Sequence, residues 1–252
     1  MTDLLRLQNV SKSFERLQAV NNLSLTVPSG QIIGLIGPNG SGKSTLLNLI
    51  SGMLPVDAGQ IHFAGEEISG LPADQIFERG LVRSFQDPSL FFRMSVLDNA
   101  LLPVKAQVGE RPTRAPMHSA WRGQETQAAA NADELLASLQ LRGHYAELAA
   151  ELSGGQMKLL ELGRSLMGEP QMLLLDEPTA GVAPNLAYTI FQQIDAMRRE
   201  LGLTFLIVEH RLEMLFDFVD SVYVMHMGQV IAHGAPDEVA QDAQVREVYF
   251  GE

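Results

Sequence analysis

Short apolar runs alternate with amphipathic segments along most of this chain. Leu5, Leu7 and Val10 punctuate one stretch in the alternating manner of a strand, and residues 23–27 repeat the pattern. The apolar runs at 31–36 and 171–176 are instead typical of buried strands. Further strands are predicted at 60–64, 81–85, 203–208, 220–226 and 229–233, and helices at 44–51, 156–167, 184–200 and 211–217, with two short helices closing the chain. Strands that alternate with helices predict an α/β fold with a mostly parallel sheet.

The middle of the chain follows a helical pattern instead. Helices are predicted at 95–102 and 125–140, and the second carries Leu135, Leu136 and Leu139 on one face. The segment 103–124 between them contains three prolines, two glycines and mixed charge, which favours a surface excursion or a plain connector. We therefore expect one domain over 1–252, with an α/β core formed by 1–90 and 166–252 and an inserted helical lobe at 91–165.

Composition narrows the class of protein. The 252 residues are 46% hydrophobic and 19% charged, as in a globular protein, and the absence of cysteine excludes disulfides and Cys-ligated zinc. The net charge of −12 argues against nucleic acid or an anionic lipid surface as the main partner. No signal peptide is recognisable at the N-terminus, and no run approaches the roughly 18 apolar residues that a membrane span needs.

Residues 37–44 carry the most specific chemistry. They read Gly-Pro-Asn-Gly-Ser-Gly-Lys-Ser and fit the phosphate-binding loop pattern, between a predicted strand and a predicted helix. Glycines let several backbone N–H groups point at one anion, and Lys43 adds a charge for the β- and γ-phosphates. The Ser44 hydroxyl suits Mg²⁺. The loop therefore predicts a nucleoside triphosphate site.

Two carboxylates end the apolar strand that leads to Pro178. Ligands of parallel sheets bind beyond the carboxyl ends of the strands, so Asp176 is placed for Mg²⁺ and Glu177 can polarise an attacking water. Without a phosphate loop elsewhere in the sequence, such a pair would more often begin an ordinary loop.

The sequence Leu152-Ser-Gly-Gly-Gln156 precedes a helix and has two interpretations. Ser153 and Gln156 have the spacing of a capping box. Gly154 and Gly155 weaken a first turn, however, and exposed N–H groups at a helix N-terminus bind anions. Capping and phosphate binding can both hold.

Three further residues are ambiguous when taken singly. Gln86 follows a predicted strand and could reach Mg²⁺ or the water, although a lone Gln is by default a surface residue. His210 follows another strand, where a structural role is the commoner one. Phe14 could stack on adenine or belong to the core.

Together these residues stand in the order and spacing of the ATPase subunit of an ABC transporter, which this chain resembles over essentially its whole length. The resemblance implies a two-lobed P-loop ATPase with an antiparallel β edge and an inserted helical lobe. It also implies that Phe14 stacks on adenine, that Gln86 links Mg²⁺ to the contact with the membrane subunit, and that His210 holds the γ-phosphate. In this family the helix after Ser153 faces the nucleotide of a second ATPase subunit.

The expected site follows from the loop, the two carboxylates and this resemblance. The cofactors are ATP and Mg²⁺, and the partners are transmembrane permease subunits and a second ATPase subunit, identical or related, at the cytoplasmic face of the cell membrane. The expected catalytic residues are Glu177, His210 and Gln86; the nucleotide-binding residues are Phe14, Gly37, Pro38, Asn39, Gly40, Ser41, Gly42, Lys43, Ser44, Thr45, Ser153, Gly154, Gly155 and Gln156; and the metal ligands are Ser44, Gln86 and Asp176.

A finer resemblance is to the ATPases of branched-chain amino acid importers. It is carried by 17–22, 82–86, 208–210, the 103–124 excursion and the ending Tyr249-Phe-Gly-Glu252. Two features depart from the pattern: many members of this subgroup have Tyr where Gly154 stands, and 180–184 lacks the Asp common in ABC proteins after the two carboxylates. Importers of urea and short amides remain an alternative.

Two other classes are disfavoured by the residues themselves. A soluble ABC-type ATPase acting on nucleic acid would need a long coiled coil or two cassettes, whereas this sequence shows no sustained heptads and one phosphate loop. A binding module without catalysis would not need Glu177 and His210.

Overall fold

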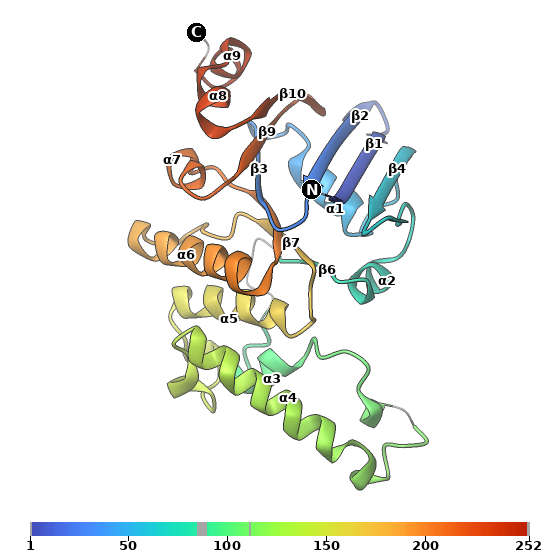
Figure 1. Ribbon diagram of the computed structural model, residues 1–252, viewed down its shortest axis with the longest axis vertical. Coiled ribbons are helices and arrows are strands. Elements are labelled where there is room, and N and C mark those ends of the chain that lie inside the picture. The colour runs from blue at the N-terminus through green and yellow to red at the C-terminus, as the bar shows by residue number, and fades with distance from the viewer. Residues whose placement is uncertain (1, 85–89, 111, 251–252) are drawn as a thin grey trace. The chain divides into compact units, whose positions relative to one another are not determined.

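The computed structural model describes residues 2–84, 90–110 and 112–250. The protein divides into two compact units (Figure 1), one formed by 1–86 with 171–252 and the other by 87–170. The sequence-based boundaries at 90/91 and 165/166 thus differ by four to five residues from the division found here.

A six-stranded sheet forms the centre of the first unit. Its strand order is β10-β9-β3-β8-β7-β6, and all neighbours pair in parallel except β10 with β9. The strands are β3 (Ile32–Ile36), β6 (Leu81–Arg83), β7 (Met172–Asp176), β8 (Thr204–Val208), β9 (Ser221–His226) and β10 (Gln229–Gly234). Every residue of β3, β7 and β8 is buried, as expected for central parallel strands.

A second, antiparallel sheet of the same unit has the order β2-β1-β4-β5. Its strands are β1 (Asp3–Phe14), β2 (Leu17–Pro28), β4 (Ala58–Phe63) and β5 (Glu66–Glu67). The buried positions of β1 include Leu5, Leu7 and Val10, so the alternation in the sequence does mark the core face. The α/β fold with an antiparallel edge is confirmed.

Two helices of this unit, α6 and α8, begin with a proline. Helix α6 has Pro184 in its first turn and buries Ile190, Phe191 and Ile194 on one stripe. Its N-cap is Ala183, which offers no side-chain acceptor, at the segment that lacks the expected Asp. The helices are α1 (Lys43–Ile50), α2 (Ala73–Glu78), α6 (Pro184–Leu201), α7 (Leu212–Phe216), α8 (Pro236–Gln241) and α9 (Ala243–Phe250).

The second unit is helical in its described part. It contains α3 (Val96–Leu101), α4 (His118–Ser138) and α5 (Gly154–Leu166), with short 3₁₀ turns at Val108–Glu110, Arg142–His144 and Ala149–Glu151. The predicted helix at 125–140 was wrong at its start, because α4 begins at His118, inside the expected excursion. The polar sequence and Gly123 hide this first part of the helix from periodicity analysis.

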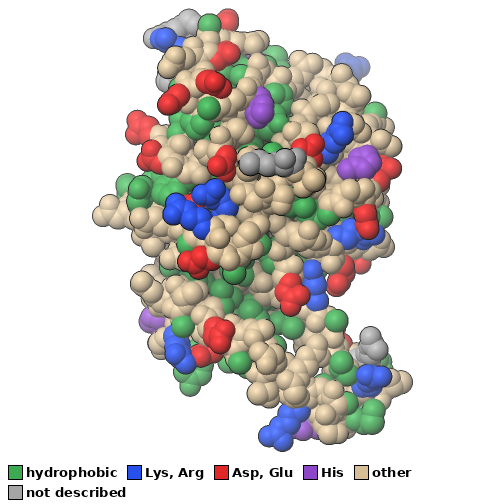
Figure 2. Space-filling view, viewed as in Figure 1, with side chains coloured by type: hydrophobic (Ala, Val, Ile, Leu, Met, Phe, Trp, Pro, Cys, Tyr) green, Lys and Arg blue, Asp and Glu red, His purple; other side chains and the backbone are tan. Residues whose placement is uncertain are grey.

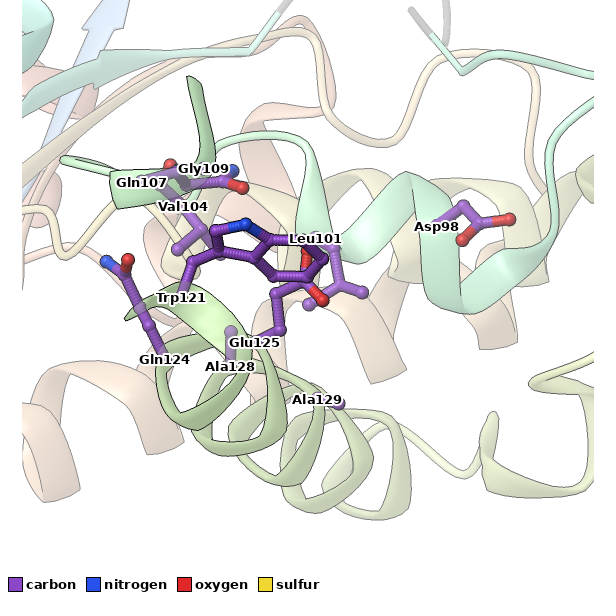
Figure 3. Close-up of a pocket in the computed structure, with 10 residues that line it drawn as sticks. All are labelled: Asp98, Leu101, Val104, Gln107, Gly109, Trp121, Gln124, Glu125, Ala128 and Ala129. Carbon is purple, nitrogen blue, oxygen red and sulfur yellow. Dashed lines mark hydrogen bonds between the residues drawn. The ribbon is translucent and has the colours of Figure 1, made fainter. Parts of the chain in front are cut away.

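Hydrogen bonds from two side chains of α4 explain how the segment before this helix is held. The Gln124 amide donates to the Ala106 carbonyl at 3.1 Å and accepts from the Val108 N–H at 2.9 Å. The Trp121 indole N–H donates to the Ala115 carbonyl at 3.0 Å. Trp121 also lines a cavity of about 330 Å³, and Figure 3 shows its ring in the midst of the lining side chains, with Asp98 at the far end. These bonds tie Ala106, Val108 and Ala115 of the preceding segment to α4.

The surface of the described residues carries both signs of charge. Figure 2 shows acidic and basic side chains interspersed over the face that it displays. Within the described residues, no helix combines the length and the hydropathy that crossing a bilayer demands.

We predict that Gln124→Ala loosens the 106–110 segment. Loss of its two hydrogen bonds, at about 1 kcal/mol each, should raise amide hydrogen exchange at 106–110 by fivefold or more, with only a small change in the melting temperature. Gln127→Ala is the matched control, because Gln127 bonds only to exposed Asn131 on the same helix. Equal exchange in both variants would contradict this account.

Candidate nucleotide site

The phosphate-binding loop connects β3 to α1 in the expected strand–loop–helix arrangement. Gly42 caps the helix in a left-handed conformation with φ of 104°, and a Cβ atom there would lie 2.2 Å from the Ala19 carbonyl oxygen. A side chain would clash at this position, and the φ angle also favours glycine. The helix N-terminus therefore opens with bare N–H groups, which suit an anion.

Lys43 is buried within the loop that it serves. Its Nζ donates to the carbonyl oxygens of Gly37 at 2.8 Å and Pro38 at 2.9 Å. Burial lowers the pKa of the Lys43 ammonium, and the nearby charges of Glu177 and Asp176 act in the opposite direction. The charge is thus held in place by weak acceptors, and a phosphate would offer it stronger ones.

One cavity of about 540 Å³ collects most of the predicted residues of this unit. It is lined by Phe14, Leu17, Gln18, Ala19, Asn39, Gly40, Gly42, Lys43, Ser44, Thr45, Glu177, His210, Met227 and Gly228. Phe14 ends β1 and is 42% exposed, and the Lys12 Nζ lies 5.8 Å from the ring centroid. A partly exposed aromatic ring at the mouth of a phosphate site is suited to stacking on a base.

Glu177 and His210 meet at the edge of the sheet. The Nε2 atom of His210 lies 2.9 Å from Oε1 of Glu177. Glu177 follows β7 with φ of 51°, an uncommon conformation for a residue with a side chain, and its N–H donates to the Val208 carbonyl at 2.9 Å. The strained backbone and this bond aim the carboxylate into the cavity beside His210.

A third carboxylate, Glu209, supports both of these residues from behind. It is only 4% exposed and accepts hydrogen bonds from the Thr179 N–H at 3.0 Å, the Thr179 hydroxyl and the His210 N–H at 3.0 Å. Thr179 and His210 belong to the loops after β7 and β8. Glu209 therefore ties together the two loops that carry Glu177 and His210.

Asp176 is held by an arginine rather than exposed in the cavity. Nη2 of Arg83 lies 3.0 Å from Oδ2 of Asp176, both side chains are almost fully buried, and Arg83 also bonds to Asn48 of α1. The Ser44 hydroxyl and the Asp176 carboxylate are oxygen donors of the kind that Mg²⁺ takes, so the donor set fits this ion. Gln86, the third expected ligand, lies outside the described residues.

The motif of the helical unit forms the predicted capping box. The Gln156 N–H donates to the Ser153 hydroxyl at 3.3 Å, and the Ser153 N–H donates to the Gln156 side chain at 2.9 Å. A Cβ atom on Gly154 would meet no atom within 4 Å. Packing among the described residues therefore does not require glycine at 154. Ser153–Gln156 lie in the second unit and are not among the residues that line the cavity.

The C-terminal helix also reaches the phosphate loop. The Tyr249 hydroxyl is hydrogen-bonded to the backbone of Gly37, and burial raises the pKa of Tyr249 to about 12, opposed in part by this bond. Tyr249 titrates well above neutral pH, so it keeps its proton there.

Sequence reasoning missed several residues of the site. Arg83 and Glu209 are charged residues at or after apolar strands, a signal that could have marked both as buried partners. Leu17, Met227 and Gly228 enter the cavity through strand pairing that no local pattern encodes.

Comparison with protein families identifies the family to which this site belongs. Residues 20–180 match the family model of the ABC transporter. The chain belongs to the ABC transporter family. Residues 229–252 match a second family model, the branched-chain amino acid ATP-binding cassette transporter. The protein is thus an ATP-binding, ATP-hydrolysing cassette, as the sequence predicted.

Relatives of this cassette extend over its full length. It is 41% identical to a protein named probable branched-chain amino acid transport ATP-binding protein LivG from Methanocaldococcus jannaschii, over 99% of this chain and 98% of that protein. It is 34% identical to the lipopolysaccharide export system ATP-binding protein LptB of Escherichia coli K12, over 97% and 96%. Among solved structures, an ABC transporter cassette in its ADP conformation matches with a TM-score of 0.87 and 40% identity over all of both proteins.

We predict that Glu209→Gln impairs hydrolysis while leaving ATP affinity within about threefold. Hydrogen bonds to a charged group contribute about 1.5–3 kcal/mol each, and the amide can accept at only one of its two atoms. We expect the free energy of unfolding to fall by about 2 kcal/mol and kcat by about tenfold, measured by denaturant titration and steady-state hydrolysis. Glu213→Gln, an exposed carboxylate on α7, is the control. Hydrolysis at the parent rate in Glu209→Gln would refute the positioning role.

Proposed function

We propose that this cassette powers the import of branched-chain amino acids through separate membrane subunits. The observation that carries the proposal is the match of residues 229–252 to the branched-chain amino acid cassette family, beyond the general ABC match. The full-length similarity to a LivG protein supports it. The cassette would then lie at the cytoplasmic face of the membrane, bound to its permease subunits.

The residues of the loop would bind the triphosphate. The backbone N–H groups of 39–44 and the Lys43 ammonium would contact the β- and γ-phosphates and stabilise charge that develops during transfer. Phe14 would stack on the adenine. Ser44 and Asp176, with Gln86, would hold Mg²⁺, which neutralises phosphate charge when bound.

Glu177 would take the proton of the attacking water. As the water oxygen bonds to the γ-phosphorus and ADP leaves, the carboxylate accepts the proton or orients the water. His210, at 2.9 Å from Glu177, would contact the γ-phosphate and keep the carboxylate in position. Both residues line the same cavity as Lys43, which supports this division of roles.

The end of α5 would serve a second cassette. Ser153–Gln156 present a capped helix terminus with an uncrowded glycine, which fits the γ-phosphate bound to a facing subunit. A solved relative, 24% identical, is described as the dimeric structure of a cassette in a post-hydrolysis state bound to ADP and phosphate. The facing subunit would be a second copy or a related protein.

A second candidate function has a specific observation in its favour. The 34% identity to LptB, a lipopolysaccharide export ATPase, leaves an exporter as an alternative. Importers of urea and short amides are the alternative that the sequence left open. Amino acid import is favoured because residues 229–252 match the amino acid cassette family, and because the LivG protein of Methanocaldococcus jannaschii is more similar to this chain, at 41% identity, than LptB is.

We predict that Glu177→Gln abolishes turnover and traps ATP-bound dimers. The amide is nearly isosteric but cannot accept the water proton, so hydrolysis should slow by about 10²–10⁴. Persisting ATP then favours association of two cassettes by mass action. Size-exclusion chromatography with and without Mg-ATP and a phosphate-release assay measure both effects, with exposed Glu200→Gln as control. Retained hydrolysis near the parent rate would exclude Glu177 from water activation.

Transport itself is tested in vesicles. The cassette, co-purified with its membrane subunits, is reconstituted into proteoliposomes with ATP on the cassette side. We expect uptake of leucine, isoleucine or valine, delivered by the cognate binding protein, and no uptake with the Glu177→Gln cassette. Stimulated hydrolysis without amino acid uptake, or with uptake of urea instead, would overturn the solute assignment while leaving the ATPase intact.

A further inference from the structure

The turn between β9 and β10 has a conformation that its first residue does not favour. His226 pairs with Gln229, so Met227 and Gly228 form a two-residue hairpin loop. Their φ angles are 46° and 77°. Two successive positive φ values define a type I′ turn, in which Asn-Gly is the preferred pair, because Asn tolerates the left-handed region better than a long side chain does. The geometry of the turn therefore does not explain why methionine occupies position 227.

Packing does not account for Met227 either. Its side chain is 75% exposed, the highest value among the large hydrophobic residues that are exposed in the described part of the protein. It nevertheless lines the cavity that contains the phosphate loop. A strained backbone position that presents an apolar side chain to the cavity of the phosphate loop points to a ligand.

The turn is fixed firmly to the site. The Gly228 N–H donates to the Ser41 carbonyl at 2.9 Å, and the Gly228 carbonyl accepts from the Asn21 N–H at 2.8 Å. A Cβ atom on Gly228 would lie 2.9 Å from the Ala19 carbonyl oxygen. The turn thus packs between the phosphate loop and β2, and its hydrogen bonds fix the position of Met227 beside both.

Two other exposed apolar side chains beside this turn both come from the β1–β2 hairpin. Phe14 and Leu17 face each other across the β1–β2 hairpin and are 42% and 67% exposed. Both line the cavity with Met227. The phosphate-binding residues supply charge and N–H groups, whereas these three supply apolar surface of the kind that a flat aromatic ring covers.

We infer that Met227 binds the nucleobase, closing with Phe14 and Leu17 an apolar site for the ring of the nucleoside triphosphate. The inference rests on the proposed placement of the triphosphate at Lys43. A thioether packs favourably against aromatic rings and adapts to their outline, so the contact adds affinity for purines without a hydrogen-bond requirement. Met227 does not touch the phosphates or take part in proton transfer.

The experiment compares Met227→Asn with the parent protein for two ligands. Asn suits the type I′ turn, so the melting temperature should stay the same or rise. Affinity for Mg-ATP, measured by isothermal titration or displacement of a fluorescent nucleotide, should fall by about two- to tenfold. Affinity for Mg-tripolyphosphate, which has no base, should not change.

Two further variants serve as controls. Met227→Leu should retain ATP affinity within about twofold. Met53→Asn, at another exposed methionine outside the cavity, is the matched control.

The possible results distinguish a failure of the Met227 inference from a failure of the proposed triphosphate site. Unchanged ATP affinity in Met227→Asn would overturn the inference, as would an equal loss for ATP and tripolyphosphate, which would show that the turn acts through the phosphate loop. Failure of the parent protein to bind ATP, or undiminished ATP binding after Lys43→Ala, would instead contradict the proposed triphosphate site.

Discussion

The parallel pairing of β3 with β8, and of β8 with β7, is the constraint on which the site depends. Leu35 pairs with Val208 and Asp176 with the same Val208, so three strand ends coincide at one edge of the sheet. The phosphate loop, Glu177 and His210 each follow one of these strands. Parallel strands must be joined by crossovers, which is why residues about 130 and 170 positions apart from the loop in sequence arrive at one cavity.

This convergence brings like charges together, and the neighbouring residues balance them. Asp176, Glu177 and Glu209 all end up at the same edge of the sheet. Asp176 is paired with Arg83, Glu177 with His210, and Glu209 with N–H and hydroxyl groups of the adjoining loops. Each carboxylate thereby receives a different partner, and each can take a different part in the chemistry. Glu177 is the one whose partner is half-exposed and whose backbone is strained.

Much of this arrangement could be predicted from the sequence, because its signals are local. The glycine loop, the apolar strand before Asp176 and the periodicity of 184–200 each specify one element, and the strand–helix order specifies the sheet. The start of α4 could not be predicted in this way, since Gln124 and Trp121 stabilise a polar first turn through contacts with residues up to 18 positions earlier. Glu209 and Met227 were missed for a related reason: their partners lie on loops that meet only after the sheet has formed.

The cavity as described has all its walls in one unit of the protein, while the capped helix end with Gly154 belongs to the other. Within this cavity, the phosphate loop with Lys43 and the His210 side chain are the groups proposed to meet the triphosphate. A Cβ atom on Gly154 would have open space around it, so this helix end leaves room for the second cassette proposed above. If the second cassette supplies this helix end to the site, hydrolysis can be coupled to its arrival. If hydrolysis is tied to the state of a separate permease, as proposed above, such dependence would prevent the loss of ATP by the isolated cassette.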